Sequence, residues 1–103
     1  MRFIFGRAFV FGWDARKATL NQAKHGVAFS AIEEFDFDSC VDVEDTRKDY
    51  GEVRYVAIGF IAERLFVTVF TFRDLEKEIA TVWVISLRKA NKREIDKYVR
   101  ETE

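Results

Sequence analysis

Three short strings of the sequence combine side chains that can move protons with side chains that can hold a phosphate. They are Lys24-His25, Glu52-Val53-Arg54 and Arg88-Lys89. Histidine and glutamate are suited to general acid–base work. The fork of an arginine binds phosphate oxygens bidentately, which lysine cannot copy. These strings predict acid–base chemistry at a phosphate, with Arg88 as the first candidate for the phosphate contact.

Each of these residues also has a purely structural interpretation. His25 ends a predicted helix, where the macrodipole favours a cation and a histidine often serves only as a cap. Glu52 and Arg54 share one face of a predicted strand, and taken alone such a pair is more often a surface ion pair. Arg73 ends another predicted strand and would otherwise be a solvated terminus. The residue types alone leave both interpretations open.

The elements that position the first string are marked by caps and glycines, because the chain has no proline. Residues 9–13 are aromatic and β-branched, which predicts a strand. Asp14 is a good N-cap for a helix over residues 15–25, and Gly26 stands where a C-terminal glycine belongs. Ser30 and Glu33 predict a capping box for a second, short helix over about residues 31–37.

The second half of the chain reads as strands followed by a helix. Strands are predicted over residues 40–44, 53–60, 65–72 and 79–87, with a hairpin link at 62–64. Asn91 and Glu94 predict a capping box that begins a helix through about residue 100, with Ile95, Tyr98 and Val99 facing inward. Short links favour antiparallel neighbours, so we expect one α+β domain over residues 1–103, with helices packed on an antiparallel sheet.

The composition supports a core and excludes several kinds of site. Hydrophobic residues make up 49% of the chain, and eleven of them are phenylalanines. The phenylalanines at 66, 70 and 72 favour core packing over base stacking, because both faces of their strand are apolar. One cysteine and one histidine exclude a disulfide framework and the common zinc sites, so no cofactor or metal is expected. No membrane-spanning run is present, and we expect a cytoplasmic protein.

The charges are unevenly distributed along the chain. The formal net charge is −1. Residues 33–52 hold nine acidic and two basic side chains, a sum of −7, so the remainder carries +6. A chain polarised in this way can meet an anion on one side and a basic partner, near Asp42 and Glu44, on the other.

Four motifs, taken together and in order, resemble the BrnT family. They are Phe11-Gly12-Trp13-Asp14 with Lys17 and Asn21; Lys24-His25-Gly26-Val27 with Phe29; Tyr50-Gly51-Glu52 with Arg54; and Ile85-Ser86-Leu87-Arg88-Lys89-Ala90 with Glu94 and Tyr98. The resemblance covers residues 11–98. Two positions depart from it: Trp83 stands where the family usually has arginine, and Leu87 where it usually has alanine. The first departure removes a cation from the expected active surface.

The resemblance implies a RelE-like fold of β-α-α-β-β-β-β-α order and a ribonuclease that restrains translation. It also implies a BrnA-like antitoxin with a ribbon-helix-helix DNA-binding part, and contact with operator DNA only through that antitoxin. A metal-independent ribonuclease of this type directs the 2′-hydroxyl of RNA at the adjacent phosphate. The catalytic candidates are then His25, Glu52, Arg54 and Arg88, and the RNA-binding candidates are Lys24, Arg73 and Lys89.

Two functions remain open at this point. In the first, the chain is an endoribonuclease toxin in which Arg54 and Arg88 stabilise phosphate charge and His25 or Glu52 moves protons. In the second, it is a non-catalytic protein that binds a DNA-binding antitoxin, alone or as a dimer, and tunes operon repression. Trp83 favours the second function, and the motif set favours the first.

Overall fold

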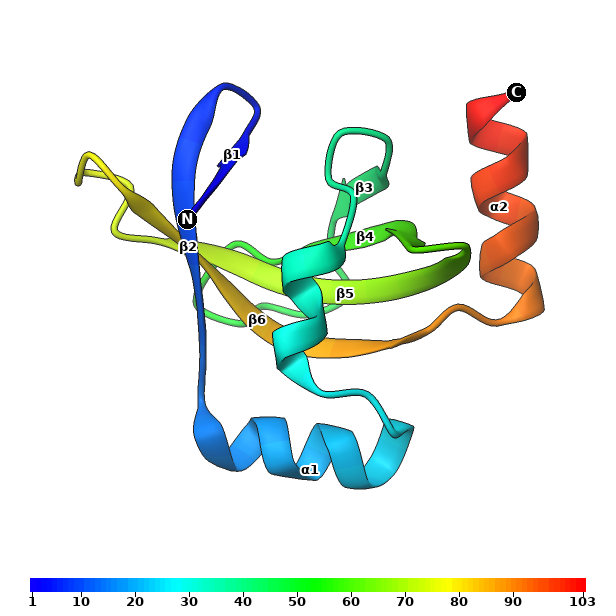
Figure 1. Cartoon of the computed structure of the whole chain (residues 1–103), viewed down its shortest axis with the longest axis horizontal. Helices are drawn as coiled ribbons and strands as arrows, with labels where there is room; N and C mark the ends of the chain where they lie inside the picture. The colour runs from blue at the N-terminus through cyan, green and yellow to red at the C-terminus, as the bar shows by residue number, and fades with distance from the viewer.

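The computed structural model describes residues 1–103 and is built around a six-stranded sheet of order β1-β2-β6-β5-β4-β3 (Figure 1). The elements are β1 (Arg2–Ile4), β2 (Arg7–Trp13), α1 (Ala15–His25), the 3-10 helix η1 (Phe29–Glu34), β3 (Val41–Glu44), β4 (Tyr55–Ile61), β5 (Arg64–Arg73), β6 (Ala80–Lys89) and α2 (Lys92–Thr102). The α+β class is confirmed. None of the helices has both the length and the apolar character needed to cross a membrane.

The sheet is mixed, which corrects the expectation of a purely antiparallel one. Consecutive strands pair antiparallel, as the short links predicted, and β4 and β5 are joined by a two-residue turn at Ala62 and Glu63. The exception is β2, which lies parallel to β6, with Phe11 opposite Val82. Most of the chain separates these two strands, so no short link dictates their direction.

A first strand that the sequence did not predict precedes β2. Arg2–Ile4 pairs with Arg7–Phe9 through a two-residue turn in which Phe5 and Gly6 have φ of 55° and 77°. Two consecutive positive φ values match the turn that closes tight hairpins. A phenylalanine at the first of these positions is unusual, so the turn had no clear sequence signal.

Helix α1 begins and ends where its caps predicted. The Asp14 side chain accepts a hydrogen bond from Lys17 N–H, and Gly26 has the left-handed conformation at the other end. Asn21 is buried on this helix, donates to Leu87 O at 2.7 Å and accepts from Leu87 N–H. The pairing of β2 with β6 ends at Val84, so Leu87 has no neighbouring strand on that side. The Asn21 amide takes the place of this strand, and the contact fixes α1 beside β6.

The second predicted helix is a 3-10 helix with earlier bounds and without its predicted capping box. It begins at Phe29 after Ala28, and no side chain caps it. Phe29 and Ile32 are both buried, three residues apart. Side chains at i and i+3 lie on one side of a 3-10 helix, so this spacing anchors it to the sheet.

One side of the sheet, the packed face, carries most of the core. The 3-10 helix crosses in front of it in Figure 1. The members of this core share exposures of at most 6% and include Phe9, Phe29, Ile32, Phe35, Phe37, Ala57, Phe70, Val82 and Leu87. Gly59 is required here, because a Cβ would approach the Phe35 ring to 2.7 Å. The phenylalanines of β5 that belong to this side pack in the core, in agreement with the preferred interpretation of their pattern.

The opposite side, the open face, is covered at one corner by α2 and, further along, by the loop of residues 45–54. This helix begins with the predicted capping box of Asn91 and Glu94. Tyr98 is buried and donates its hydroxyl to Ser39 O at 3.0 Å. Ile95 and Val99 do not face inward as predicted and are 40% and 47% exposed. Only the Tyr98 part of the apolar stripe meets the sheet, where it packs with Ile58, Leu65 and Val67 on the open face.

Candidate functional site

Polar and charged side chains of β5 and β6 alternate onto the open face. Trp83 pairs with Thr71, and Arg73 pairs with Thr81. A register shift at Val69/Phe70 then places Ser86 opposite Val69 and Arg88 opposite Val67. Residues two apart on a strand share a face. The shift leaves Ile85 without a partner and keeps Trp83, Ser86 and Arg88 on the same side of the sheet.

The loop of residues 45–54 lies across the same face, on the side of the sheet away from η1 (Figure 1). Its ends meet, because Asp45 N–H donates to Arg54 O at 2.7 Å. The hydroxyl of Thr71 donates to Val53 O at 2.6 Å and fastens the loop to β5. This attachment brings Glu52 and Arg54, which precede β4, against side chains of β5.

Glu52 lies between two arginines. Its carboxylate accepts a hydrogen bond from Arg54 Nε at 3.0 Å and lies 4.0 Å from Arg73 Nη2. Arg54 stacks over the Tyr50 ring, with its guanidinium carbon 4.2 Å from the ring centroid. The side chains of Glu52 and Arg54 are 31% and 21% exposed. The pair is thus part of a larger, half-buried group, and it is more than an isolated surface ion pair.

Arg73 connects this group to Trp83. Its guanidinium carbon lies 3.9 Å from the centroid of the Trp83 ring. Cations are attracted to the face of an indole. The resemblance led us to expect an arginine at position 83 on β6. Arg73 of β5 lies over this position instead, so the open face keeps a cation there.

Arg88 forms a bidentate ion pair with Glu94. Both of its terminal nitrogens lie 2.7 Å from carboxylate oxygens, and one of those oxygens also accepts Asn91 N–H. These hydrogen bonds are the main cause that lowers the pKa of Glu94 and raises that of Arg88. Glu94 therefore does more than cap its helix: it fixes the arginine fork at the end of β6.

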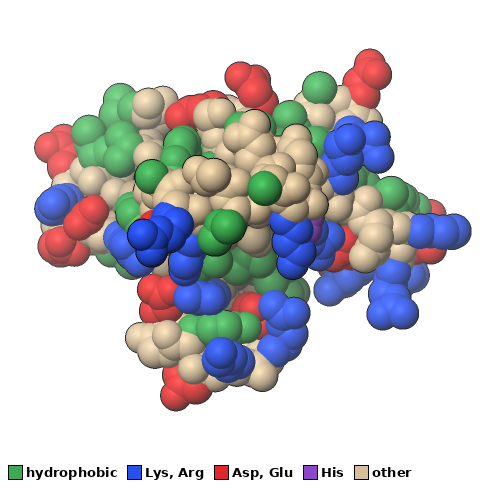
Figure 2. Space-filling view, turned by 90° about the horizontal axis from the view of Figure 1, so that it is seen from below, with side chains coloured by type: hydrophobic (Ala, Val, Ile, Leu, Met, Phe, Trp, Pro, Cys, Tyr) green, Lys and Arg blue, Asp and Glu red, His purple; other side chains and the backbone are tan.

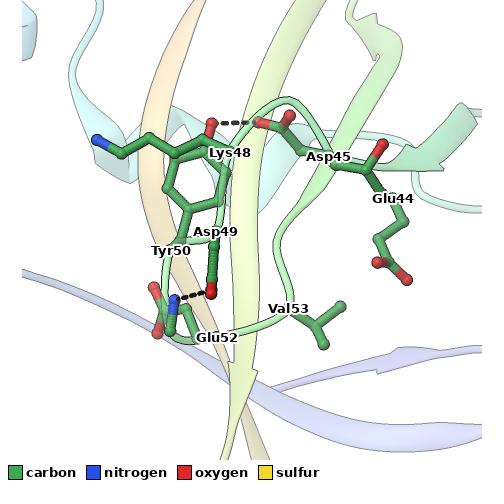
Figure 3. A pocket seen from close by; sticks show the side chains of 9 residues that line it. Glu44, Asp45, Lys48, Asp49, Tyr50, Glu52 and Val53 are labelled. Carbon is green, nitrogen blue, oxygen red and sulfur yellow. Dashed lines mark hydrogen bonds between the residues drawn. The ribbon is translucent and has the colours of Figure 1, made fainter.

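Two further loop residues, Arg47 and Tyr50, extend the group. In the sequence, Tyr50 stands out only as part of a motif, and no role in the site is predicted for Arg47. Arg47 binds Asp45 through two hydrogen bonds of 2.8 Å. The Tyr50 hydroxyl donates to the same carboxylate at 3.1 Å, as Figure 3 shows. Arg47 holds the pKa of Asp45 well below its usual range. Because Tyr50 also lies under Arg54, it joins the Asp45–Arg47 pair to the Glu52 group.

His25 and Lys24 lie at the border of this surface. They line a shallow pocket of about 230 Å³ that also includes Lys17, Ile85 and Ser86. Ser86 belongs to the open face, so the pocket adjoins that face at the end of α1. Figure 2 views the molecule from the α1 side and shows Lys and Arg side chains spread over it, with the only histidine among them.

Lys89 is the predicted site residue that does not join the others. It pairs with Phe66 and therefore lies on the packed side of the sheet, opposite Arg88. Of the remaining candidates, Glu52, Arg54 and Arg73 form one group, Arg88 lies at its far end, and Lys24 and His25 lie at its border. No three His, Cys, Asp or Glu side chains are grouped so as to hold a metal ion.

The largest hollow of the molecule lies inside the loop and differs in character from this surface. It has a volume of about 510 Å³, and Figure 3 shows the carboxylates of Glu44, Asp49 and Glu52 around it. Clustered carboxylates repel an anion, so this hollow is not suited to a phosphate. The arginines instead offer forked donors and positive charge to an anionic ligand spread over the open face.

Comparison with known protein families identifies one match. Residues 13–94 match the profile of one family, described as "Ribonuclease toxin, BrnT, of type II toxin-antitoxin system". Among curated proteins, no relative matches the chain. The matched stretch contains Glu52, Arg54, Arg73 and Arg88 together with both border residues. The chain therefore belongs to the BrnT family of ribonuclease toxins of type II toxin–antitoxin systems.

Proposed function

We propose that the chain is a metal-independent endoribonuclease whose site is the open face of the sheet. The observation that carries this proposal is the position of Glu52, one carboxylate held beside two arginines on a solvent-facing sheet. A base next to cations is what attack of a 2′-hydroxyl on the adjacent phosphate requires. The resemblance to RelE-like toxins is part of the same proposal, and helices on a largely antiparallel sheet support it.

In the reaction, Glu52 takes the proton from the 2′-hydroxyl, whose oxygen then bonds to phosphorus. The bond from phosphorus to the 5′ oxygen breaks, and that oxygen takes up a proton. The products are a 2′,3′-cyclic phosphate and a free 5′-hydroxyl. Arg54 and Arg88 stabilise the negative charge that develops on the phosphate oxygens. His25, at the border of the face, is the candidate donor of the second proton, and Lys24 and Arg73 hold the RNA backbone.

RNA cleavage in EDTA tests this proposal directly. The purified, partner-free protein should cut RNA and should leave intact the same strand with 2′-deoxyribose at the cleaved position. Arg88→Ala should lose most of the activity, and Arg88→Lys should stay well below wild type because lysine lacks the fork. Equal cleavage by wild type and Arg88→Ala, or cleavage only after a divalent metal is added, contradicts the proposal.

The alternative is a non-catalytic protein that only binds its antitoxin. It predicts no cleavage of free RNA or of ribosome-bound RNA by a folded wild-type chain, and no growth arrest when the chain is expressed alone. The sequence argument for it was the loss of a cation at Trp83. Because Arg73 lies over that ring, the observed contacts favour the ribonuclease.

Membership of a type II toxin–antitoxin family implies an antitoxin partner. We propose that this partner is BrnA-like and basic, that it contacts operator DNA through a ribbon-helix-helix part, and that it neutralises a toxin that acts by halting translation. Strand β3 is the edge of the sheet, and its Asp42 and Glu44 are exposed. An unpaired edge with acidic side chains suits a basic partner segment.

A charge-reversal experiment tests the docking part of this proposal. Asp42→Lys with Glu44→Lys should weaken antitoxin binding by tenfold or more while RNA cleavage stays at the wild-type level. Glu101→Lys on α2, which is also exposed, is the matched control and should bind normally. Unchanged affinity of the double variant contradicts docking at β3.

A further inference from the structure

The Trp83 ring lies on the open face where the neighbouring strand leaves it room. Gly12 of β2 is opposite Trp83 in the sheet. A Cβ at Gly12 would come within 3.1 Å of two atoms of the indole, so a larger residue there would push the ring away. The indole is therefore seated against the backbone of β2 and is held in one place on the sheet.

Arg73, which covers the ring, is the most loosely held of the four arginines on this surface. Arg47, Arg54 and Arg88 each donate a hydrogen bond of 3.0 Å or shorter to a carboxylate. Arg73 reaches its carboxylate, Glu52, only at 4.0 Å, and its side chain is 46% exposed. Its guanidinium therefore presents an open plane to solvent while it rests on a fixed aromatic ring.

We infer that Arg73 and Trp83 together form a stacking site for one unpaired nucleobase of the RNA, beside the Glu52–Arg54 pair. Nucleobases stack on guanidinium planes as well as on aromatic rings, and the open plane here is that of Arg73, which rests on the Trp83 ring. This inference rests on the proposed ribonuclease function and adds to it a substrate class. A base can reach the site only when it is not paired, so the site selects single-stranded RNA over duplex.

The position also explains what Trp83 contributes in place of a cation. A second arginine on β6 would repel Arg73 and would offer only a further phosphate contact. An indole instead attracts Arg73 and adds a broad apolar surface. The pair thus provides a positive charge and a stacking surface at the same place.

Binding of a 2′-O-methyl oligonucleotide tests the inference without interference from cleavage, because its blocked 2′ oxygen cannot attack. In a Trp13→Phe background, Trp83 is the only indole, and its fluorescence should change saturably as the single strand binds. Trp83→Leu should weaken binding by about tenfold or more, whereas Trp83→Phe should keep most of the affinity because a ring remains. The same sequence as a blunt duplex should bind more weakly than the single strand.

The outcomes separate this inference from the proposed function. Two results together overturn the stacking site and leave the ribonuclease standing. A folded Trp83→Leu variant binds and cleaves RNA like the wild type, and the Trp83 fluorescence of the Trp13→Phe protein does not change when the single strand binds. Absence of both binding and cleavage in the wild type overturns both. Should Trp83→Leu fail to fold, the fluorescence response and the Trp83→Phe variant still decide the inference, because both keep a ring against Gly12.

Discussion

Aromatic side chains on the two faces of the sheet have different surroundings. On the packed face, Phe35, Phe37 and Phe70 are at most 4% exposed, and the Phe35 and Phe37 ring centroids lie 4.7 Å apart. On the open face, Tyr50 and Trp83 each lie under an arginine. The first arrangement removes apolar area from water, and the second positions charge at the surface. Stability should therefore depend on the packed face, and activity on the open face.

The largest expected effect comes from the packed face. Phe35→Ala should lower the free energy of unfolding by about 3–5 kcal/mol, because it leaves a cavity in a close-packed cluster. Phe3→Ala is the matched control, since Phe3 is 68% exposed, and it should change that free energy by less than about 0.5 kcal/mol. Urea unfolding measures both, and similar losses in the two variants would break the distinction between the faces.

Arg54 on the open face should affect the rate of RNA cleavage much more than the free energy of unfolding. Arg54→Ala should lower the rate of RNA cleavage by about 100-fold, since it removes a fixed cation from the developing charge. Its free energy of unfolding should stay within about 1 kcal/mol of wild type, because a partly exposed ion pair contributes little. Single-turnover cleavage and urea unfolding of one preparation test this, and a large loss of stability with normal cleavage would contradict it.

A smaller effect should appear in the pH dependence of stability at the end of β6. Glu94→Gln keeps a residue that can form the capping box but removes the charge that binds Arg88. Because Arg88 lowers the pKa of Glu94 below its ordinary 4.5, the ion pair stabilises the fold above that pH. The advantage of wild type over Glu94→Gln, about 1 kcal/mol at pH 7, should shrink as the pH falls below 4.5. Urea unfolding at pH 7 and pH 3.5 measures it, and a difference that grows toward acid pH would contradict the assignment.

The smallest expected effect is slow labelling of the Cys40 thiol in the folded protein. This thiol packs against the core of the packed face, and burial, together with the nearby Asp42 and Asp36, raises its pKa to about 12. The thiolate is the reactive form of cysteine. A maleimide at pH 8 should therefore label the folded protein much more slowly than the urea-unfolded protein. Equal rates would mean that the packed face does not protect this residue.

Local signals in the sequence predicted local structure well. Asp14, Gly26 and the Asn91–Glu94 box each act through neighbouring backbone groups, and all three stand where they were expected. The same reasoning failed at Ser30, where burial of Phe29 and Ile32 decided the start of the helix. It also failed for Ile95 and Val99, because periodicity does not reveal how much of a helix meets its sheet.

The site could be predicted only in part, for a related reason. The motifs named Glu52, Arg54 and Arg88, and the end of a predicted strand named Arg73. The contacts that join Glu52, Arg54 and Arg73 depend on the path of the 45–54 loop. Two contacts to the loop backbone set that path. Thr71 binds Val53, which is distant in the sequence, and Asp45 binds Arg54 at the other end of the loop. Arg47 therefore had no sequence signal, and Tyr50 was named only as part of a motif. Lys89 could be assigned to the opposite side only from its strand register.

The central claim, that the open face carries the ribonuclease site, is tested most directly on strand β5. Arg73 and Arg64 are both exposed arginines of this strand, and the register places them on opposite sides of the sheet. Cleavage of one RNA in EDTA should be at least tenfold slower for Arg73→Ala than for wild type, and unchanged for Arg64→Ala. Equal rates for the two variants, or a loss only in Arg64→Ala, would contradict the claim.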